Sequence, residues 1–324
     1  MTSKIKQYSS EEESMFDLLT YMGRLKHFSK MTDIRLIFLA NNKLEKYLDM
    51  IQDFNNNPNK YDLKNTEINK QLWEARYGMR SAINSETGKI IPVYARMCAF
   101  VPCNIPIAFG LICLPVTRFN ILSFNILNQS YNALMNYSNS SGTDDSIKFV
   151  AISYALALTS SVGIGLLLKS RFSRNSAQNL GLFKEVLIRF LPSCMAGFLN
   201  IFFMRSDYFL KGINVKDEKG NILGTSRISG AKAVIEGGLT RFILPLPLIA
   251  NHFILKRVNQ YPLNKKIKVG LELILCALAL GFGLPCSIAL FKENSKLGVN
   301  WLEKEIQEKA RQQGIYYLIY NKGL

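Results

Sequence analysis

The sequence predicts an all-α membrane protein, a bundle of about five transmembrane helices preceded by an amphipathic helical region. Its mean hydropathy is +0.07 although 20% of the 324 residues are charged, so apolar and charged residues must be segregated along the chain. Residues 97–117 and 149–168 contain no charged side chain. Each stretch is long enough to cross a hydrocarbon core of about 30 Å as a helix. These observations disfavour a soluble protein with a single core.

The amino-terminal region, residues 1–95, is polar and is predicted to form three helices. The first is indicated by apolar residues that recur every three positions: Phe16, Leu19, Met22, Leu25 and Phe28. A second helix is predicted at 41–54, before the turn-forming run NNNPNKYD. The third covers 71–82 and presents the apolar residues Leu72, Trp73, Ala75 and Met79.

Five apolar segments form the predicted bundle, residues 96–291. They lie at 97–117, 149–168, 190–204 with an extension through 186–188, 242–255, and 273–291. The fourth has only 14 uncharged residues, so its helix must either extend back past Glu236 or be broken. Residues 292–324 are predicted to be a polar carboxy-terminal tail.

Prolines are concentrated in these segments, and they predict broken helices because proline removes an intrahelical hydrogen bond. Such breaks leave helix ends that can meet the charged groups of a solute. Seven of the ten prolines fall here: Pro102, Pro106, Pro115, Pro192, Pro245, Pro247 and Pro285. The polar loop 211–227, with Gly220-Asn221 between two short β-prone runs, is compatible with a small hairpin or with a solvated connector.

The composition argues against several other classes of protein. Six cysteines without a C-x-x-C pair and only two histidines predict no metal site, and no cofactor is expected. The sequence has no G-x-S-x-G elbow, phosphate loop or dinucleotide fingerprint, so we do not expect an enzyme. The net charge of +16 suits anionic lipid better than nucleic acid, because aromatic residues are not interleaved with the basic ones.

A row of amides lies between the first two apolar segments. Asn128, Asn132 and Asn136 are spaced four apart, so a helix would place them on one face, joined by Gln129. Each amide offers two donors and an acceptor. The stripe could therefore bind a small polar solute or could cross-link neighbouring helices.

The residues of this stripe resemble a known family signature. NQSYNALMNYSNSSG, residues 128–142, is similar to the sideroflexin run N-Q-S-x-N-A-x-x-N-Y-x-N-R-S-G. QLWEARYGMRSAINSETG resembles the segment that leads into the family's H-P-D-T-G loop, and FLNIFFMR resembles its N-I-P-L-M-R. KGINVKDEKGNILGTSR and the tail IYNKGL resemble the family's hairpin-like loop and carboxy terminus. Together these motifs cover roughly residues 28–324 in one register.

The resemblance implies a multi-pass carrier of the mitochondrial inner membrane with five spans. Members of the family are linked to the import of serine and other small neutral amino acids that feeds one-carbon metabolism. Some branches were described as tricarboxylate carriers, and another acts in respiratory-complex assembly. LTRFILPLPLIANHF and FGLPCSIALF look most similar to the tricarboxylate branch. The resemblance alone therefore leaves the solute open.

Charge favours a small amino acid over citrate. A citrate ion of about three negative charges would need several fixed cations in a medium of low dielectric constant. The strong spans contain none, and the nearest candidates are Arg205, Arg241 and His252. Zwitterionic serine needs one carboxylate partner and several amides. The predicted binding residues are Asn104, Asn128, Gln129, Asn132, Asn136, Asn200, Arg205 and Arg241. Citrate transport and a non-transporting assembly scaffold remain the alternatives.

The chain departs from the family pattern in two places. The H-P-D-T-G loop is replaced by Asn84, Ser85, Glu86, Thr87 and Gly88, and the arginine expected after the last stripe asparagine is Ser140. If either position carries transport, the activity or the substrate range changes. A loop cap is still expected, because Ser85 or Thr87 can accept a backbone hydrogen bond.

Overall fold

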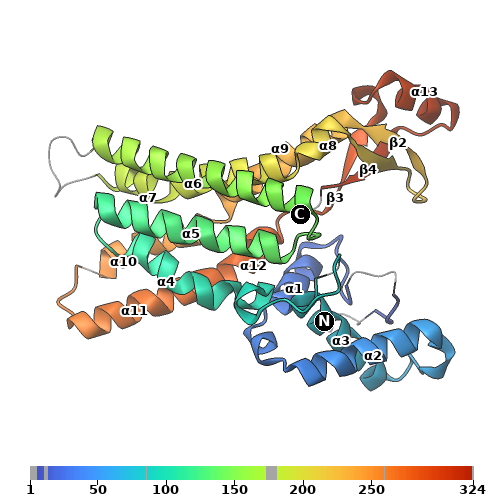
Figure 1. Cartoon of the computed structure of the whole chain (residues 1–324), viewed down its shortest axis with the longest axis horizontal. Coiled ribbons are helices and arrows are strands. Elements are labelled where there is room, and N and C mark those ends of the chain that lie inside the picture. Colours follow the sequence, from blue (N-terminus) through green and yellow to red (C-terminus); the bar gives the residue numbers. More distant parts are fainter. Residues whose placement is uncertain (1–5, 11–13, 85, 173–180, 259, 323–324) are drawn as a thin grey trace. The chain divides into compact units, whose positions relative to one another are not determined.

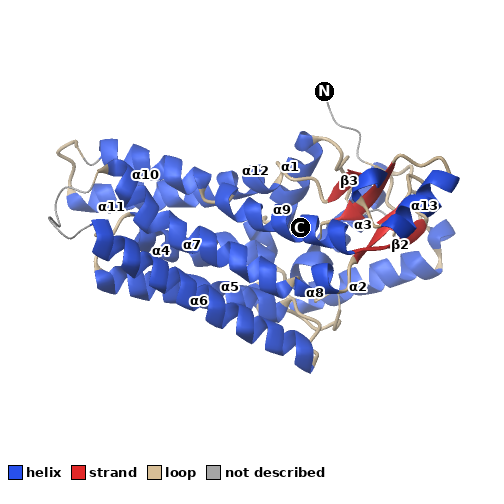
Figure 2. Cartoon of the chain, turned by 90° about the horizontal axis from the view of Figure 1, so that it is seen from above, coloured by secondary structure: helices blue, strands red, loops and turns tan. Residues whose placement is uncertain are grey.

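The computed structural model describes residues 6–10, 14–84, 86–172, 181–258 and 260–322 (Figure 1). Helices dominate, and the strands gather in one sheet (Figure 2). The helices are α1 (Tyr21–Met31), α2 (Asn41–Asn56), α3 (Thr66–Ala82), α4 (Phe100–Ile112), α5 (Arg118–Ser138), α6 (Asp144–Phe172), α7 (Leu182–Met204), α8 (Ser206–Leu210), α9 (Arg227–Ile243), α10 (Leu246–Val258), α11 (Lys265–Leu278), α12 (Leu284–Ile288) and α13 (Lys304–Gln312). The strands are β1 (Ile213–Lys216), β2 (Ile222–Ser226), β3 (Asn294–Gly298) and β4 (Tyr317–Asn321).

The chain divides into two compact units that alternate along the sequence. The first comprises Met1–Leu114, Ser130–Ile147 and Pro247–Leu290. The second comprises Pro115–Gln129, Lys148–Leu246 and Phe291–Leu324. The division passes through α5 between Gln129 and Ser130, so this one helix contributes to both units.

The amino-terminal helices pack around an aromatic core in the first unit. The Tyr8 ring lies edge-on to Trp73 and Phe54, with ring centroids 5.0 and 4.9 Å apart. Leu72, Trp73 and Ala75 have no exposed surface, which confirms the predicted apolar face of the third helix. Such burial of large side chains provides the main hydrophobic stabilisation of this region.

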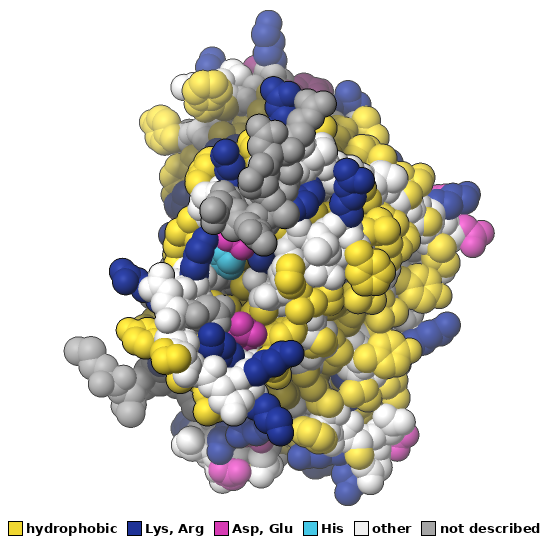
Figure 3. Space-filling model, turned by 90° about the vertical axis from the view of Figure 1, so that its left-hand side faces the viewer, with side chains coloured by type: hydrophobic (Ala, Val, Ile, Leu, Met, Phe, Trp, Pro, Cys, Tyr) yellow, Lys and Arg dark blue, Asp and Glu magenta, His cyan; other side chains and the backbone are white. Residues whose placement is uncertain are grey.

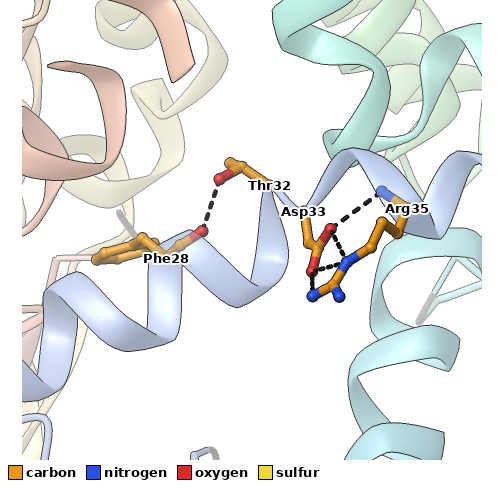
Figure 4. Close-up of polar contacts among 4 residues, drawn as sticks. All are labelled: Phe28, Thr32, Asp33 and Arg35. Carbon is orange, nitrogen blue, oxygen red and sulfur yellow. Dashed lines mark hydrogen bonds and ion pairs between the residues drawn. The ribbon is translucent and has the colours of Figure 1, made fainter. Parts of the chain in front are cut away.

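The first predicted helix begins later than its apolar spacing suggested. α1 starts after Thr20, whose hydroxyl accepts a hydrogen bond from the Gly23 backbone N–H at 3.0 Å, so Phe16 and Leu19 precede the helix. Figure 4 shows its other end, where Thr32 Oγ1 donates to the Phe28 carbonyl. A hydroxyl acceptor at the first turn fixes where a helix begins.

The next turn of the chain is capped by a carboxylate. Asp33 Oδ1 accepts a hydrogen bond from the Arg35 backbone N–H at 3.0 Å and so caps the short 3₁₀ turn Ile34–Phe38 (Figure 4). The Arg35 guanidinium also pairs with the Asp33 carboxylate at 2.6 Å. This ion pair is largely exposed, so it contributes little to stability.

In the described part of the chain, four helical stretches are long and apolar enough to cross a membrane. They are Asp144–Phe172, Leu182–Met204, Arg227–Val258 and Lys265–Ile288. The first predicted span, 97–117, is corrected to a shorter apolar stretch, Met97–Ile112. It stops before Pro115, and the Asn120 side chain donates to the Pro115 carbonyl to start α5 instead. Pro115 has no backbone N–H with which to extend the hydrogen-bonded ladder of the preceding helix.

Two of the long stretches are interrupted, as the prolines predicted. The fourth predicted segment both extends back to Arg227 and breaks at 244–245, between α9 and α10. A π-helical turn, Ala279–Gly283, separates α11 from α12 just before Pro285. By contrast, Pro106 and Pro192 lie inside continuous helices, so the prediction of a break was wrong there.

These helices expose large apolar side chains, which is the pattern expected where lipid is the solvent. At most a third of each apolar window is buried within the protein. Figure 3 shows one face on which hydrophobic side chains cover wide areas between scattered basic ones. The exposed apolar residues of these stretches include Ile152, Leu167, Ile235, Leu239, Ile274 and Phe282.

Of the two forms compatible with residues 211–227, the structure shows the hairpin, and the carboxy-terminal residues add to it. β1 and β2 pair antiparallel, and β4 and β3 extend the sheet in the order β2-β1-β4-β3. α13 packs on this sheet, and the shared core contains Val215, Leu297, Ile306, Leu318 and Tyr320. The described residues of the predicted tail thus contribute β3, α13 and β4 to a small folded module.

The tail also contacts α9 through two charged side chains. Glu303 Oε1 accepts hydrogen bonds from the backbone N–H groups of Arg227 and Ile228, at 2.7 and 3.1 Å, and so caps α9. Partial burial acts to raise the pKa of Glu303, but hydrogen bonds from the Ser226 hydroxyl and these N–H groups lower it overall. Farther along α9, Lys322 Nζ lies 2.8 Å from Glu236 Oε2.

We predict that Gly230→Ala destabilises the second unit. A Cβ at this position of α9 would lie 1.7 Å from the Tyr208 carbonyl oxygen, so α8 and α9 must separate. We expect a loss of about 1–3 kcal/mol in the free energy of unfolding, measured by thermal unfolding in detergent. The control is Gly163→Ala in α6, where a Cβ meets nothing within 4 Å. Equal melting of the two variants would contradict the prediction.

Candidate functional site

The amide stripe lies on α5, as its spacing predicted, but its members belong to different units. Asn128 and Gln129 are in the second unit, whereas Asn132 and Asn136 are in the first. The Asn128 side chain donates to Ser193 Oγ of α7 at 3.4 Å, a weak cross-link between the two helices. Gln129 is buried, with 2% of its surface exposed.

One face of α7 brings together residues of three helices in the second unit. Ser193, Gly197 and Asn200 are four and three residues apart, so they share a face. Asn128 of α5 contacts this face at Ser193. The Arg241 side chain of α9 packs against this face at Gly197. A Cβ added to Gly197 would lie 3.2 Å from Cβ and Cγ of Arg241. We define this set as the α7 face.

The two arginines of the predicted site have different surroundings. Arg205 follows α7 directly, and its Nη1 donates to the Lys322 carbonyl at 2.6 Å. Burial lowers the pKa of Arg205. Arg205 thus holds the carboxy-terminal tail. Arg241 lies within the apolar stretch Arg227–Val258, and no hydrogen bond or ion pair joins it to another of the described residues. We therefore treat its guanidinium as the candidate partner for a solute.

Asn104 belongs to the first unit, whereas the α7 face belongs to the second. It is on α4 in the first unit, 6% exposed, and its Nδ2 donates to the Phe100 carbonyl one turn earlier at 2.8 Å. A side chain that bonds its own helix in this way satisfies its donor locally. Asn104 and Asn200 thus belong to different units.

The loop at 84–88 is built around the amide of Asn84. Asn84 Oδ1 accepts hydrogen bonds from the backbone N–H groups of Glu86 and Thr87, at 2.8 and 3.0 Å. Its Nδ2 donates to the carbonyls of Ser138, the last residue of α5, and of Ser140, at 2.9 and 2.8 Å. This one side chain therefore ties the loop to the carboxy-terminal end of the stripe helix.

The remaining loop residues have smaller roles. Thr87 Oγ1 accepts a hydrogen bond from the Lys89 N–H at 3.3 Å, as expected of a cap, and Ser85 lies outside the described residues. Gly88 has a φ of +67°, a conformation that glycine adopts without strain. Sequence reasoning missed the central role of Asn84, although an asparagine that opens a turn before a glycine is a known signal.

No metal site is evident in the part of the chain that the structure describes. There, no group of three or more His, Cys, Asp or Glu side chains could hold a metal ion, and the cysteines are free thiols. His252 is a buried residue of α10. It belongs to the first unit, whereas the α7 face belongs to the second. The available chemistry is thus hydrogen bonding by amides and charge pairing by one arginine.

Comparison with known proteins gives a consistent result over nearly the whole chain. A family model described as Sideroflexins matches residues 10–324. Sideroflexin-5 of Homo sapiens is 28% identical over 95% of this chain and 91% of its own length. Sideroflexin-1 of Sus scrofa is 29% identical over the whole of both chains, and Sideroflexin-3 of Bos taurus is 29% identical over 97% of each. No solved structure shows significant similarity.

We predict that Asn84→Asp destabilises the first unit. The variant keeps the acceptor for the loop but replaces the donor with a carboxylate that faces two carbonyl oxygens. We expect a loss of about 2 kcal/mol or more at neutral pH. Because the charged form is disfavoured, the folded-state pKa of the new carboxyl is raised, and the lost stability should return as pH falls through that pKa.

The measurement is thermal unfolding in detergent at several pH values. Asn65→Asp is the matched control, because Asn65 Oδ1 only accepts a hydrogen bond, from the Glu67 N–H at the start of α3. This control should melt at or slightly above the wild-type temperature, since a negative charge at a helix amino terminus is favourable. An Asn84→Asp variant as stable as the control at neutral pH would show that the amide does not anchor α5.

Proposed function

Because the chain belongs to the sideroflexin family, we propose that it transports small neutral amino acids, with serine as the leading substrate, across the mitochondrial inner membrane. The family assignment agrees with a multi-pass membrane transporter, a class that fits the four long apolar stretches. The choice of solute rests on the chemistry of the α7 face, and the choice of membrane rests on the resemblance to the sideroflexin family. The main support for this solute is that the α7 face contains one arginine, Arg241, together with the amides of Asn128 and Asn200.

The α7 face is suited to a zwitterion. The Arg241 guanidinium can pair with one carboxylate, and the amides of Asn128 and Asn200 can bond to a hydroxyl and an ammonium group. Arg241 also offers its backbone carbonyl, because the residue four positions later is Pro245, which has no N–H to donate to it. A carbonyl released by a broken helix is a good partner for an ammonium group.

Citrate fits this face poorly. Several fixed cations would be needed to offset the desolvation of about three negative charges. Arg189 of α7 is already paired with Glu185 at 3.0 Å, and Arg205 holds the tail. Arg241 is therefore the one guanidinium on α7 or α9 that we assign to the solute.

The test is counterflow of labelled solutes in vesicles that contain the purified full-length protein. We expect exchange of labelled serine and no exchange of labelled citrate above protein-free vesicles. Arg241→Gln should reduce serine exchange about tenfold or more, since it removes a charge-assisted partner of the carboxylate. The matched control is Arg227→Gln, an exposed arginine at the start of the same helix, which should exchange serine like the wild type.

The alternatives give different results in the same assay. Citrate exchange without serine exchange would overturn the amino-acid proposal in favour of a tricarboxylate carrier. Exchange of neither solute by a folded wild-type protein would overturn transport of both and favour an assembly scaffold. Equal serine exchange by Arg241→Gln and Arg227→Gln would remove Arg241 from the site.

A further inference from the structure

Asn125 lies on the same face of α5 as the amide stripe, three residues before Asn128, the first member of the stripe. It precedes Gln129 by four residues, Asn132 by seven and Asn136 by eleven, and these spacings return to one side of an α-helix. Asn125 is also as buried as Gln129, with 2% of its surface exposed. The stripe therefore begins one turn earlier, in the second unit.

The two buried amides each leave a polar atom without a partner in the described part of the chain. Asn125 Nδ2 donates to the Ile121 carbonyl at 2.8 Å, and this bond fixes the amide so that Oδ1 is the atom left over. Oδ1 of Asn125 and Nε2 of Gln129 have no hydrogen-bond partner among the described residues. A buried polar atom that bonds to nothing is costly, and two such atoms one turn apart call for a physical reason.

An asparagine that donates to the carbonyl one turn earlier does not always leave its other amide atom buried and unpartnered. Asn104 on α4 makes the same bond to the carbonyl one turn earlier and is similarly buried. Among the described residues, neither polar atom of its amide is both buried and unpartnered. The unpaired atoms at Asn125 and Gln129 therefore reflect their place in the bundle, and they are complementary, because one is an acceptor and the other a donor.

We propose that Asn125 and Gln129 bind the head group of a zwitterionic amino acid. Asn125 Oδ1 accepts hydrogen bonds from the ammonium group, and Gln129 Nε2 donates to the carboxylate. Side chains four residues apart on a helix are neighbours with Cβ atoms about 5–6 Å apart, a span that suits two groups on one carbon atom. This assignment rests on the proposed transport of small amino acids and adds the residues that select the head group.

The proposed roles of Asn125 and Gln129 predict discrimination against solutes that lack either charged group. A purely anionic solute would leave Asn125 Oδ1 facing negative charge, and an amine without a carboxylate would leave Gln129 Nε2 unpaired. A binding site with buried polar groups rejects a ligand that lacks the matching group, because those groups are then left without hydrogen bonds. The head group is thus selected by Asn125 and Gln129, whereas Arg241 supplies the balancing charge.

The test uses the near-isosteric apolar variants Asn125→Leu and Gln129→Met of the full-length protein. Two quantities are measured: the unfolding temperature in detergent with and without L-serine, and serine counterflow in vesicles. Each variant should unfold at or above the wild-type temperature without ligand, because an unpaired buried polar atom has been removed. Each should lose the serine-dependent stabilisation and exchange serine about tenfold more slowly or worse.

Head-group probes assign the two roles. Ethanolamine lacks the carboxylate, and 3-hydroxypropanoate lacks the ammonium group. In wild-type protein both should compete poorly with serine, and Asn125→Leu should narrow the preference for serine over 3-hydroxypropanoate specifically. Asn139→Leu is the matched control, because Asn139 makes the same bond to the carbonyl four residues earlier but is exposed at the end of α5. It should behave like the wild type with all three probes.

The outcomes separate this inference from the proposed function. Wild-type protein that exchanges serine, with variants that are less stable but exchange it equally well, would overturn the binding role and make the amides structural. Wild-type protein that is stabilised by serine but exchanges none would overturn transport and keep the binding pair. Wild-type protein that neither binds nor exchanges serine would overturn both proposals.

Discussion

The structure depends on one constraint: polar groups within apolar helices must find partners inside the protein, because lipid offers none. Most of them do. Ser153 and Thr159 of α6 and Thr240 of α9 donate to carbonyls of their own helices. Arg189 pairs with Glu185 one turn earlier. These local bonds allow apolar helices to contain polar residues without losing their structure.

The same constraint explains the folded tail. Glu236 lies in the stretch Arg227–Val258, and its carboxylate would be costly to bury alone. Lys322, with 10% of its side chain exposed, pairs with it, and the Tyr320 hydroxyl donates to the same oxygen at 3.3 Å. The sheet holds β4 so that these two residues reach α9. The carboxy-terminal residues thus add a close cation to Glu236, which also has Lys232 of its own helix 3.8 Å away.

Much of this fold could be predicted from local sequence. Leu72 and Trp73 mark a buried helix face by their spacing, and the uncharged runs mark α6 and the later spans. The hairpin at 213–226 has its turn signal in Gly220-Asn221. The features that local sequence did not predict depend on distant contacts or on single residues. Nothing near Lys322 indicates a partner 86 positions earlier, and the end of α4 depends on a proline whose neighbours are otherwise apolar.

The candidate site was predictable in composition but not in grouping. The spacing of Asn128 to Asn136 indicates a helical face, yet sequence alone could not show that the structure divides this face between two units. Asn125 fits the same spacing, but it lies before the motif NQSYNALMNYSNSSG, which begins at Asn128. Arg205 and Arg241 look equivalent in the sequence. They differ because the tail occupies Arg205, and this contact requires the folded sheet.

The most direct measurement of the central constraint is a double-mutant cycle on Glu236 and Lys322, using Glu236→Gln, Lys322→Met and the double variant. If a partly buried charge without its close partner is the cost, each single variant should lose about 1–3 kcal/mol in the free energy of unfolding, since Glu236 is 30% exposed and Lys232 also lies 3.8 Å from it. The double variant should recover most of that loss. Losses that simply add in the double variant would contradict the claim that the tail stabilises the helices by neutralising a buried charge.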